Sequence, residues 1–226
     1  MVGGFHMFYQ VQLWKGLTTP YVSAHQLNKA ESYQGIWRKT TLLLLISIIL
    51  TTISSYFGIG NEQLSKFIYD TSSTEFEAIK GLFAVGQVVQ STLATILIII
   101  LPALILWVFT DTEFHKLIVI QLFVAVILMV EKLIHLPLHL YFGLDFSSSP
   151  FSLGVIVQYM TDNELVSSFF GEISLFSVWI LLIQYKYLRI ITELKPGIIL
   201  LLIVSINLLI WIFTAFFSFI KFEVLL

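Results

Sequence analysis

The sequence predicts an all-α fold: an integral membrane bundle of five transmembrane helices, preceded by an N-terminal helix at the membrane interface. Apolar residues make up 58% of the 226-residue chain, charged residues only 12%, and the net charge is −2. Soluble domains carry about 25% charged residues. Three uncharged runs, at 40–61, 81–110 and 196–220, contain 22, 30 and 25 residues. Each exceeds the roughly 20 residues that cross a hydrocarbon core, and none shows the alternation of a barrel strand.

Two shorter uncharged runs complete the predicted set of crossings. They cover residues 117–130 and 173–185, with 14 and 13 residues. Each becomes a full crossing only if it is extended over charged residues near its ends. The predicted transmembrane domain therefore covers residues 40–220, with helices at about 40–60, 84–109, 114–134, 166–186 and 198–220. The third and fourth helices then contain Glu131, Lys132 and Glu172.

The composition also excludes several classes of protein. A chain this apolar is neither disordered nor a nucleic-acid binder with a basic face. It has no cysteine, which excludes a disulfide scaffold and a thiol nucleophile. It contains neither a G-x-x-x-x-G-K-[ST] phosphate-binding loop nor a G-x-S-x-G nucleophile motif. We therefore expect no catalytic residue, no cofactor and no metal.

The distribution of positive charge predicts the orientation of the bundle. Of the 12 Lys and Arg residues, eight fall on the side of the N-terminus and four on the opposite side. Lys and Arg are retained in the cytoplasm, so we expect a cytoplasmic N-terminus and an extracellular C-terminus. Residues 1–15 lack an apolar core, and no cleavable signal peptide is expected.

Residues 1–39 are predicted to form a cytoplasmic segment. Thr19 and Pro20 are typical of an N-cap and a first helical position, and the predicted helix runs towards Arg38. Its ragged apolar side suggests an interfacial helix. The alternative is a soluble stub.

Histidines and a carboxylate share one face of the third predicted helix. Glu131, His135 and His139 follow one another at intervals of four residues. Such a set can hold zinc, but Pro137 disturbs the turn between the histidines. We therefore favour a belt of polar residues where the helix leaves the membrane.

Glu172 of the fourth predicted helix lies in the same outer layer of the membrane as that set. Ionisable residues at such depth find partners in the bundle or in a wet cavity. We expect Glu172 to contact Lys132 or His135, with separate snorkelling of each side chain as the alternative. The predicted intramembrane polar cluster consists of Glu131, Lys132, His135, His139 and Glu172.

A stripe of uncharged polar residues predicts contacts between helices. It suits interhelical hydrogen bonds, and a transport pathway is the alternative interpretation. Pro102 is expected to kink the second helix. The predicted packing face comprises Gln87, Gln90, Ser91 and Thr95 on the second helix, and Asn207, with Ser205 beside it, on the last.

Two segments resemble the bacterial form of the Yip domain family of five-helix membrane proteins. Leu17-Thr18-Thr19-Pro20 opens a helix before the first crossing, and Ile173-Ser174-Leu175-Phe176-Ser177-Val178-Trp179 contains an L-F-x-x-W signature in the fourth. The resemblance covers residues 16–219. The D-L-Y-G-P motif and the long polar N-terminal region of eukaryotic members are missing, so their Rab-binding role is not expected.

The resemblance implies a non-enzymatic protein of the bacterial cell membrane. Some bacterial members resemble accessory subunits of ABC-type exporters that confer resistance to toxic peptides. Such a subunit helps an ABC permease, an ATPase and a membrane-fusion-type protein to assemble. Besides these partners we expect contact with the lipid bilayer and none with nucleic acid.

Two other functions remain open. The first is a small transporter or channel, with Glu131, Glu172 and the glutamines of the second helix lining a path. The second is an intramembrane metal-dependent hydrolase that uses Glu131, His135 and His139.

Overall fold

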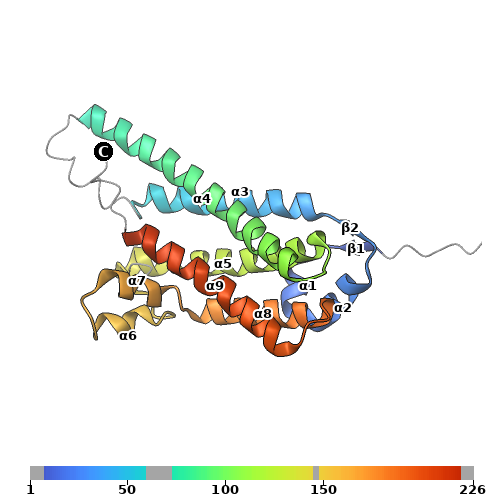
Figure 1. Ribbon diagram of the computed structural model, residues 1–226. Helices are drawn as coiled ribbons and strands as arrows, with labels where there is room; N and C mark the ends of the chain where they lie inside the picture. The colour runs from blue at the N-terminus through green and yellow to red at the C-terminus, as the bar shows by residue number, and fades with distance from the viewer. Residues whose placement is uncertain (1–7, 60–72, 145–147, 220–226) are drawn as a thin grey trace, which may run out of the picture.

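The computed structural model describes residues 8–59, 73–144 and 148–219, and it confirms the all-α class. A small N-terminal unit, residues 8–34, sits at one end of a bundle of long helices (Figure 1). In chain order the elements are β1 (Phe8–Gln10), α1 (Leu13–Thr18), α2 (Pro20–Lys29), β2 (Ser32–Gln34), α3 (Ile36–Tyr56), α4 (Ser73–Phe109), α5 (Phe114–Phe142), α6 (Gly154–Gln158), α7 (Glu164–Gly171), α8 (Leu175–Ile191) and α9 (Pro196–Phe219).

Four helices of the described residues are long and apolar enough to cross a membrane. They are Ile36–Tyr56, Thr74–Phe109, Phe114–Phe142 and Pro196–Phe216. They correspond to the first, second, third and fifth predicted crossings. Large apolar side chains on α3, α4 and α9 face outward, and Leu82, Leu201 and Val108 are 68–75% exposed. Outward-facing apolar side chains on long helices define an integral membrane protein, because such a surface is stable only in lipid.

The helix at the centre of the bundle is α5. All nine residues from 117 to 125 are buried, so this part of the helix is covered on every side. It packs against α3, α4 and α8, and α1 of the N-terminal unit also contacts it. Helix α5 continues eight residues beyond the predicted end at 134, through Pro137, and stops at Gly143. Gly143 adopts a left-handed conformation (φ 65°) and donates its N–H to the carbonyl of His139 at 2.8 Å.

The prediction of one continuous helix over 166–186 is wrong. Helix α7 ends at Gly171 and α8 begins at Leu175. The reason is the backbone of Ser174, which is extended (φ −111°, ψ 170°) and caps a new helix. Its hydroxyl accepts the N–H of Ser177, and the Ser177 hydroxyl accepts the N–H of Ser174, which is a complete capping box. The chain is also held at this break by a bridge between Ser152 and Ser174.

The N-terminal segment folds differently from the prediction. Pro20 begins a helix after Thr19, as expected, but the helix ends at Lys29 instead of continuing towards Arg38. Strands β1 and β2 pair in parallel, with Tyr9 opposite Tyr33. The apolar face of α2 does not stay free for a membrane surface. Ala24 and Leu27 are fully buried, and α2 packs against α8.

A close contact at Gly16 seats the N-terminal unit on the bundle. The backbone of Gly16 lies against the ring of Phe123, which leaves no room for a Cβ atom. The hydroxyl of Tyr187 on α8 donates to the Gly16 carbonyl at 2.9 Å, and both aromatic side chains are fully buried. Helices α1, α5 and α8 therefore meet at a residue that has to be glycine.

Hydrogen bonds connect β2 and the end of α2 to an ion pair at the start of α5. The Tyr33 hydroxyl donates to Glu113 Oε2 at 2.8 Å, and Lys116 Nζ lies 3.1 Å from Glu113 Oε1. Lys116 also donates to the carbonyl of Asn28 at 3.2 Å. The hydrogen bond from Tyr33 and the charge of Lys116 hold the pKa of Glu113 below its usual value. The N-terminal unit thus contacts the bundle through polar as well as apolar groups.

Gly16→Ala should destabilise the protein by about 1–3 kcal/mol, because its methyl group overlaps the Phe123 ring and forces side chains or backbone to move. The free energy of unfolding in mild detergent measures this, and proteolysis of the N-terminal unit should accelerate. Gly86→Ala is the matched control, since a Cβ at Gly86 meets no other atom. An unchanged stability in Gly16→Ala would contradict the seating contact.

Candidate functional site

The interrupted helix places a buried carboxylate at the start of α8. Glu131 of α5 is 9% exposed, and its Oε1 accepts a hydrogen bond from the Ser174 hydroxyl at 2.6 Å. The first-turn N–H groups of a helix carry partial positive charge, so this is a favourable place for an anion. The same serine both caps α8 and links it to α5. The interruption in the helix therefore creates the site.

Glu172 lies in the same interruption. It is the C-cap residue of α7, and its carboxyl group is near enough to that of Glu131 for their charges to interact. Two acids, one from α5 and one from the α7–α8 break, thus occupy one region of the bundle. Two neighbouring carboxylates repel each other when both are ionised.

The other members of the predicted polar cluster have separate surroundings. Lys132 Nζ donates to the Thr51 hydroxyl of α3 at 2.7 Å, on a different side of α5. His139 Nδ1 is 3.0 Å from the carbonyl of Leu144, beyond the end of α5. His135 is half-buried, and its contact with Glu172 stays a prediction. The predicted cluster is therefore divided: three of its α5 members have separate partners along and beyond the helix, and Glu172 lies at the α7–α8 break.

No group of three or more His, Asp or Glu side chains suited to a metal ion occurs within residues 8–59, 73–144 and 148–219. Glu131, His135 and His139 lie within these ranges, and their regular spacing along α5 does not bring them together as a ligand set.

The predicted packing face of α4 is partly used. The Thr95 hydroxyl donates to Ser47 Oγ of α3 at 3.0 Å, and both residues are buried. Ser91 lines a cavity of about 190 Å³ beside them, together with Lys132 of α5. Gln87 is half-buried, whereas Gln90 is exposed and does not face the other helices. The α3–α4–α5 interface thus contains a buried hydrogen bond between two hydroxyl groups.

A ladder of amide groups connects α5, α8 and α9. Asn207 Nδ2 donates to Gln184 Oε1 at 2.8 Å, and Gln184 Nε2 donates to Gln121 Oε1 at 3.4 Å. Asn207 was a predicted packing residue, but its partners were missed. Gln184 and Gln121 could have been found as candidates from the sequence, because each is an amide within an otherwise apolar helix. Gln121 is fully buried, and its Nε2 has no hydrogen-bond partner among the described residues.

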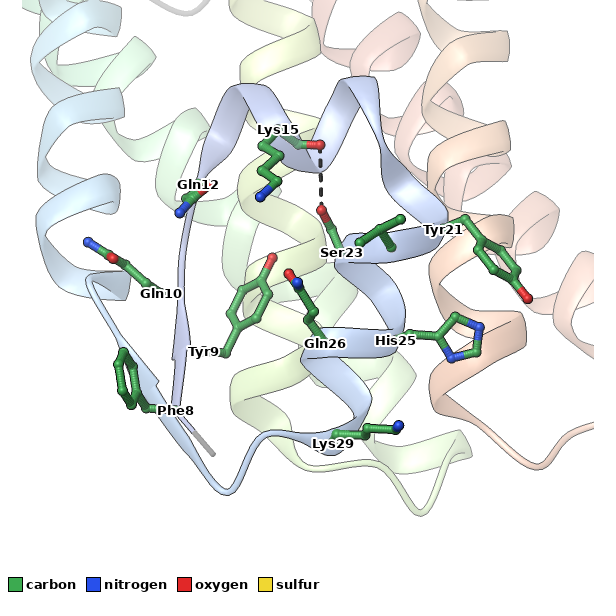
Figure 2. A pocket seen from close by; sticks show the side chains of 11 residues that line it. Phe8, Tyr9, Gln10, Gln12, Lys15, Tyr21, Ser23, His25, Gln26 and Lys29 are labelled. Atoms are coloured by element: carbon green, nitrogen blue, oxygen red, sulfur yellow. Dashed lines mark hydrogen bonds between the residues drawn. The ribbon is translucent and has the colours of Figure 1, made fainter. Parts of the chain in front are cut away.

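The N-terminal unit contains a groove that the sequence did not predict. It has a volume of about 900 Å³ and lies between β1, α1 and α2. Figure 2 shows Tyr9, Gln26 and Ser23 around its centre, with Lys15 and Lys29 at its edges. Ser23 lies 3.5 Å from the carbonyl of Lys15, and burial raises the pKa of Tyr9 to about 12. The groove has two lysines and no Asp or Glu among the described residues that line it, and it is distant from the acids at the α7–α8 break.

The fold and these polar sites define an integral membrane protein whose bundle is joined by buried hydrogen bonds. Comparison with protein-family models, with curated proteins and with solved structures found no match to this chain. The resemblance to the Yip domain family therefore stays a prediction.

Asn207→Leu should destabilise the bundle by about 0.6–2 kcal/mol, because it removes the donor to Gln184 and leaves a buried carbonyl oxygen unpaired. The free energy of unfolding in mild detergent tests this. Ser205→Ala is the control two residues away on the same helix, where the side chain is exposed. Equal effects of the two substitutions would show that the amide ladder contributes nothing.

Proposed function

We propose that this protein is a non-enzymatic accessory or assembly subunit of a bacterial membrane complex, in the first place an ABC-type exporter that confers resistance to toxic peptides. Its partners would be an ABC permease, an ATPase and a membrane-fusion-type protein. The exporter and the bacterial cell membrane are suggested by the sequence resemblance. The structure supports a protein that acts by contact between helices.

The observation that carries this proposal is the length of α4. Its 37 residues measure about 55 Å, whereas a hydrocarbon core at the usual tilt takes about 32 Å. If the hydrocarbon core begins at Phe109, the helix has crossed it by about residue 89. The remaining part of α4 diverges from α3 at the end of the bundle opposite the N-terminal unit (Figure 1). There Leu82 and Val85 are 75% and 62% exposed, although they lie beyond the core.

This projecting part of α4 suits another membrane protein. Exposed apolar side chains outside the core need a protein cover. Gly81 and Gly86 lie in the same stretch, and the space next to each is open. Small residues let the backbone of a partner helix approach closely. We therefore assign the partner contact to this stretch.

The polar groups within the bundle also favour an assembly role. Ser47 bonds Thr95, Thr51 bonds Lys132, and Ser174 bonds Glu131, each across two helices. These side chains form hydrogen bonds with one another and so connect the helices.

The proposed arrangement in the membrane has five crossings. Helix α8 has 17 residues, or about 26 Å, and runs from the end that holds α6 and α7 back to the N-terminal unit (Figure 1). We propose that it makes the fourth crossing together with α7 and the α7–α8 break. The N-terminus would then be cytoplasmic and the C-terminus extracellular, with α1 and α2 at the inner interface.

The test is co-purification in mild detergent from cells that express the chain with candidate exporter subunits. The tagged protein should retain its partners and have no turnover of its own. Gly86→Leu should reduce retention at least tenfold, because it blocks close approach at the open face of α4. Gly197→Leu, at an equally open position on α9, should retain them. Purification as a lone monomer would contradict the proposal.

A transporter or channel is the second candidate, and the two acids at the α7–α8 break favour it. Interrupted helices at membrane depth form ion and substrate sites in secondary transporters. If Glu131 and Glu172 carry protons, Glu172→Gln should abolish proton-coupled flux in reconstituted vesicles. Asp162→Asn, an exposed acid before α7, is the control and should leave the flux unchanged. Among the described residues, no group of side chains favours a metal-dependent hydrolase.

A further inference from the structure

A second groove lies between α2 of the N-terminal unit and α8 of the bundle. Its volume is about 840 Å³. Lys186 and Arg189 line it from α8, and His25 lines it from α2. No Asp or Glu occurs among the described residues that line it. The groove therefore presents two permanent positive charges with no carboxylate between them.

An apolar stripe leads along α8 to this groove. Leu175, Val178 and Leu182 are 68%, 50% and 51% exposed, and Lys186 and Arg189 continue the same face in the last turns of the helix. Leu175 and Lys186 are 11 residues apart, or about 16 Å along the axis. Half of a hydrocarbon core is about 15 Å. The stripe thus has the length of one leaflet, with its cations at one end.

Aromatic side chains mark the level of the cations. Tyr21 and Tyr185 line the groove, and Tyr21 is 68% exposed with its ring edge against His25 at 4.6 Å between centroids. Tyrosine is enriched where a membrane protein crosses from hydrocarbon to headgroups. The groove therefore lies at headgroup depth, next to a surface suited to an acyl chain.

We propose that the groove between α2 and α8 binds one anionic glycerophospholipid. The phosphate lies between Lys186 and Arg189, and an acyl chain follows Leu182, Val178 and Leu175. The guanidinium of Arg189 pairs with phosphate oxygens through two N–H groups, and Lys186 adds a point charge. Basic pockets between helices on the cytoplasmic side are a known means of headgroup recognition. This lipid also joins the N-terminal unit to α8 from outside.

The proposal depends on the membrane class of the protein and is independent of any exporter partner. Two hydroxyl groups in the groove already donate elsewhere. The Thr18 and Thr19 hydroxyls donate to carbonyls of α1, at 3.1 Å to Trp14 and 3.0 Å to Lys15. Binding therefore depends on the two cations of α8, and these are the residues to substitute.

The experiment measures lipid binding to the full chain in mild detergent by native mass spectrometry, with phosphatidylglycerol and phosphatidylcholine as probes. Phosphatidylglycerol should bind at least tenfold more tightly. Lys186→Gln with Arg189→Gln should weaken its binding about 30-fold, since each basic side chain near an anionic surface contributes about fivefold. Lys186→Arg with Arg189→Lys should stay within about threefold of the unchanged chain.

Arg38→Gln with Lys195→Gln is the matched control. It removes the same two residue types at the same end of the bundle, outside the residues that line the groove. Its binding should fall less than threefold. An equal loss of phosphatidylglycerol affinity in both double variants would show that only the overall positive charge matters, and this would overturn the proposal. Inorganic phosphate that binds as tightly as phosphatidylglycerol would show a free-anion site, and equal binding of the two lipids would also overturn it.

Discussion

The first half of helix α5 is surrounded by protein, and the buried polar side chains of this helix need partners from neighbouring helices. Within hydrocarbon an unpaired polar group costs several kcal/mol, so each such partner determines where a neighbour lies. Glu131 engages the cap of α8, Lys132 engages α3, and Gln121 reaches α8. Phe123 of α5 also contacts Gly16 of α1. The positions of α1, α3 and α8 follow from these contacts with one helix.

The same constraint explains why the helix predicted over 166–186 is interrupted. A continuous helix over 166–186 would leave Glu131 buried beside an apolar helix face. The capping box at Ser174 instead provides a hydroxyl donor and a helix start next to the carboxylate. The cost is a short non-helical stretch with its own backbone groups. Those are bonded locally, since Leu175 N donates to the Phe151 carbonyl at 2.9 Å and Leu153 N to the Ile173 carbonyl at 3.0 Å.

Composition and uncharged run length were enough to predict four long helices, because lipid imposes one requirement on every crossing. Thr95 and Asn207 were also predictable as packing residues, since a polar residue in an apolar helix needs a partner. Their partners were not, because Ser47 and Gln184 are found only when helix rotation is known. The three-residue strands are too short for a periodic signal. The break at Ser174 was missed because apolar flanks concealed a serine capping pattern.

The two ends of the molecule have different chemical character, and this suggests a division of roles. Near the N-terminal unit, basic side chains and tyrosines surround two grooves. At the other end, α4 projects with open glycines and exposed apolar residues. A protein that binds lipid headgroups at one end and a membrane partner at the other would hold a complex in a defined orientation.

The arrangement with five crossings can be tested directly because the chain has no cysteine. Single cysteines in place of Gln26, Tyr159 and Glu193 would be treated with a membrane-impermeant thiol reagent in intact and in permeabilised cells. All three positions are exposed, and Tyr159 is 90% exposed. We expect labelling at 159 in intact cells, and labelling at 26 and 193 only after permeabilisation. Labelling of 159 and 193 from the same side would show that α8 does not cross the membrane and would contradict the account.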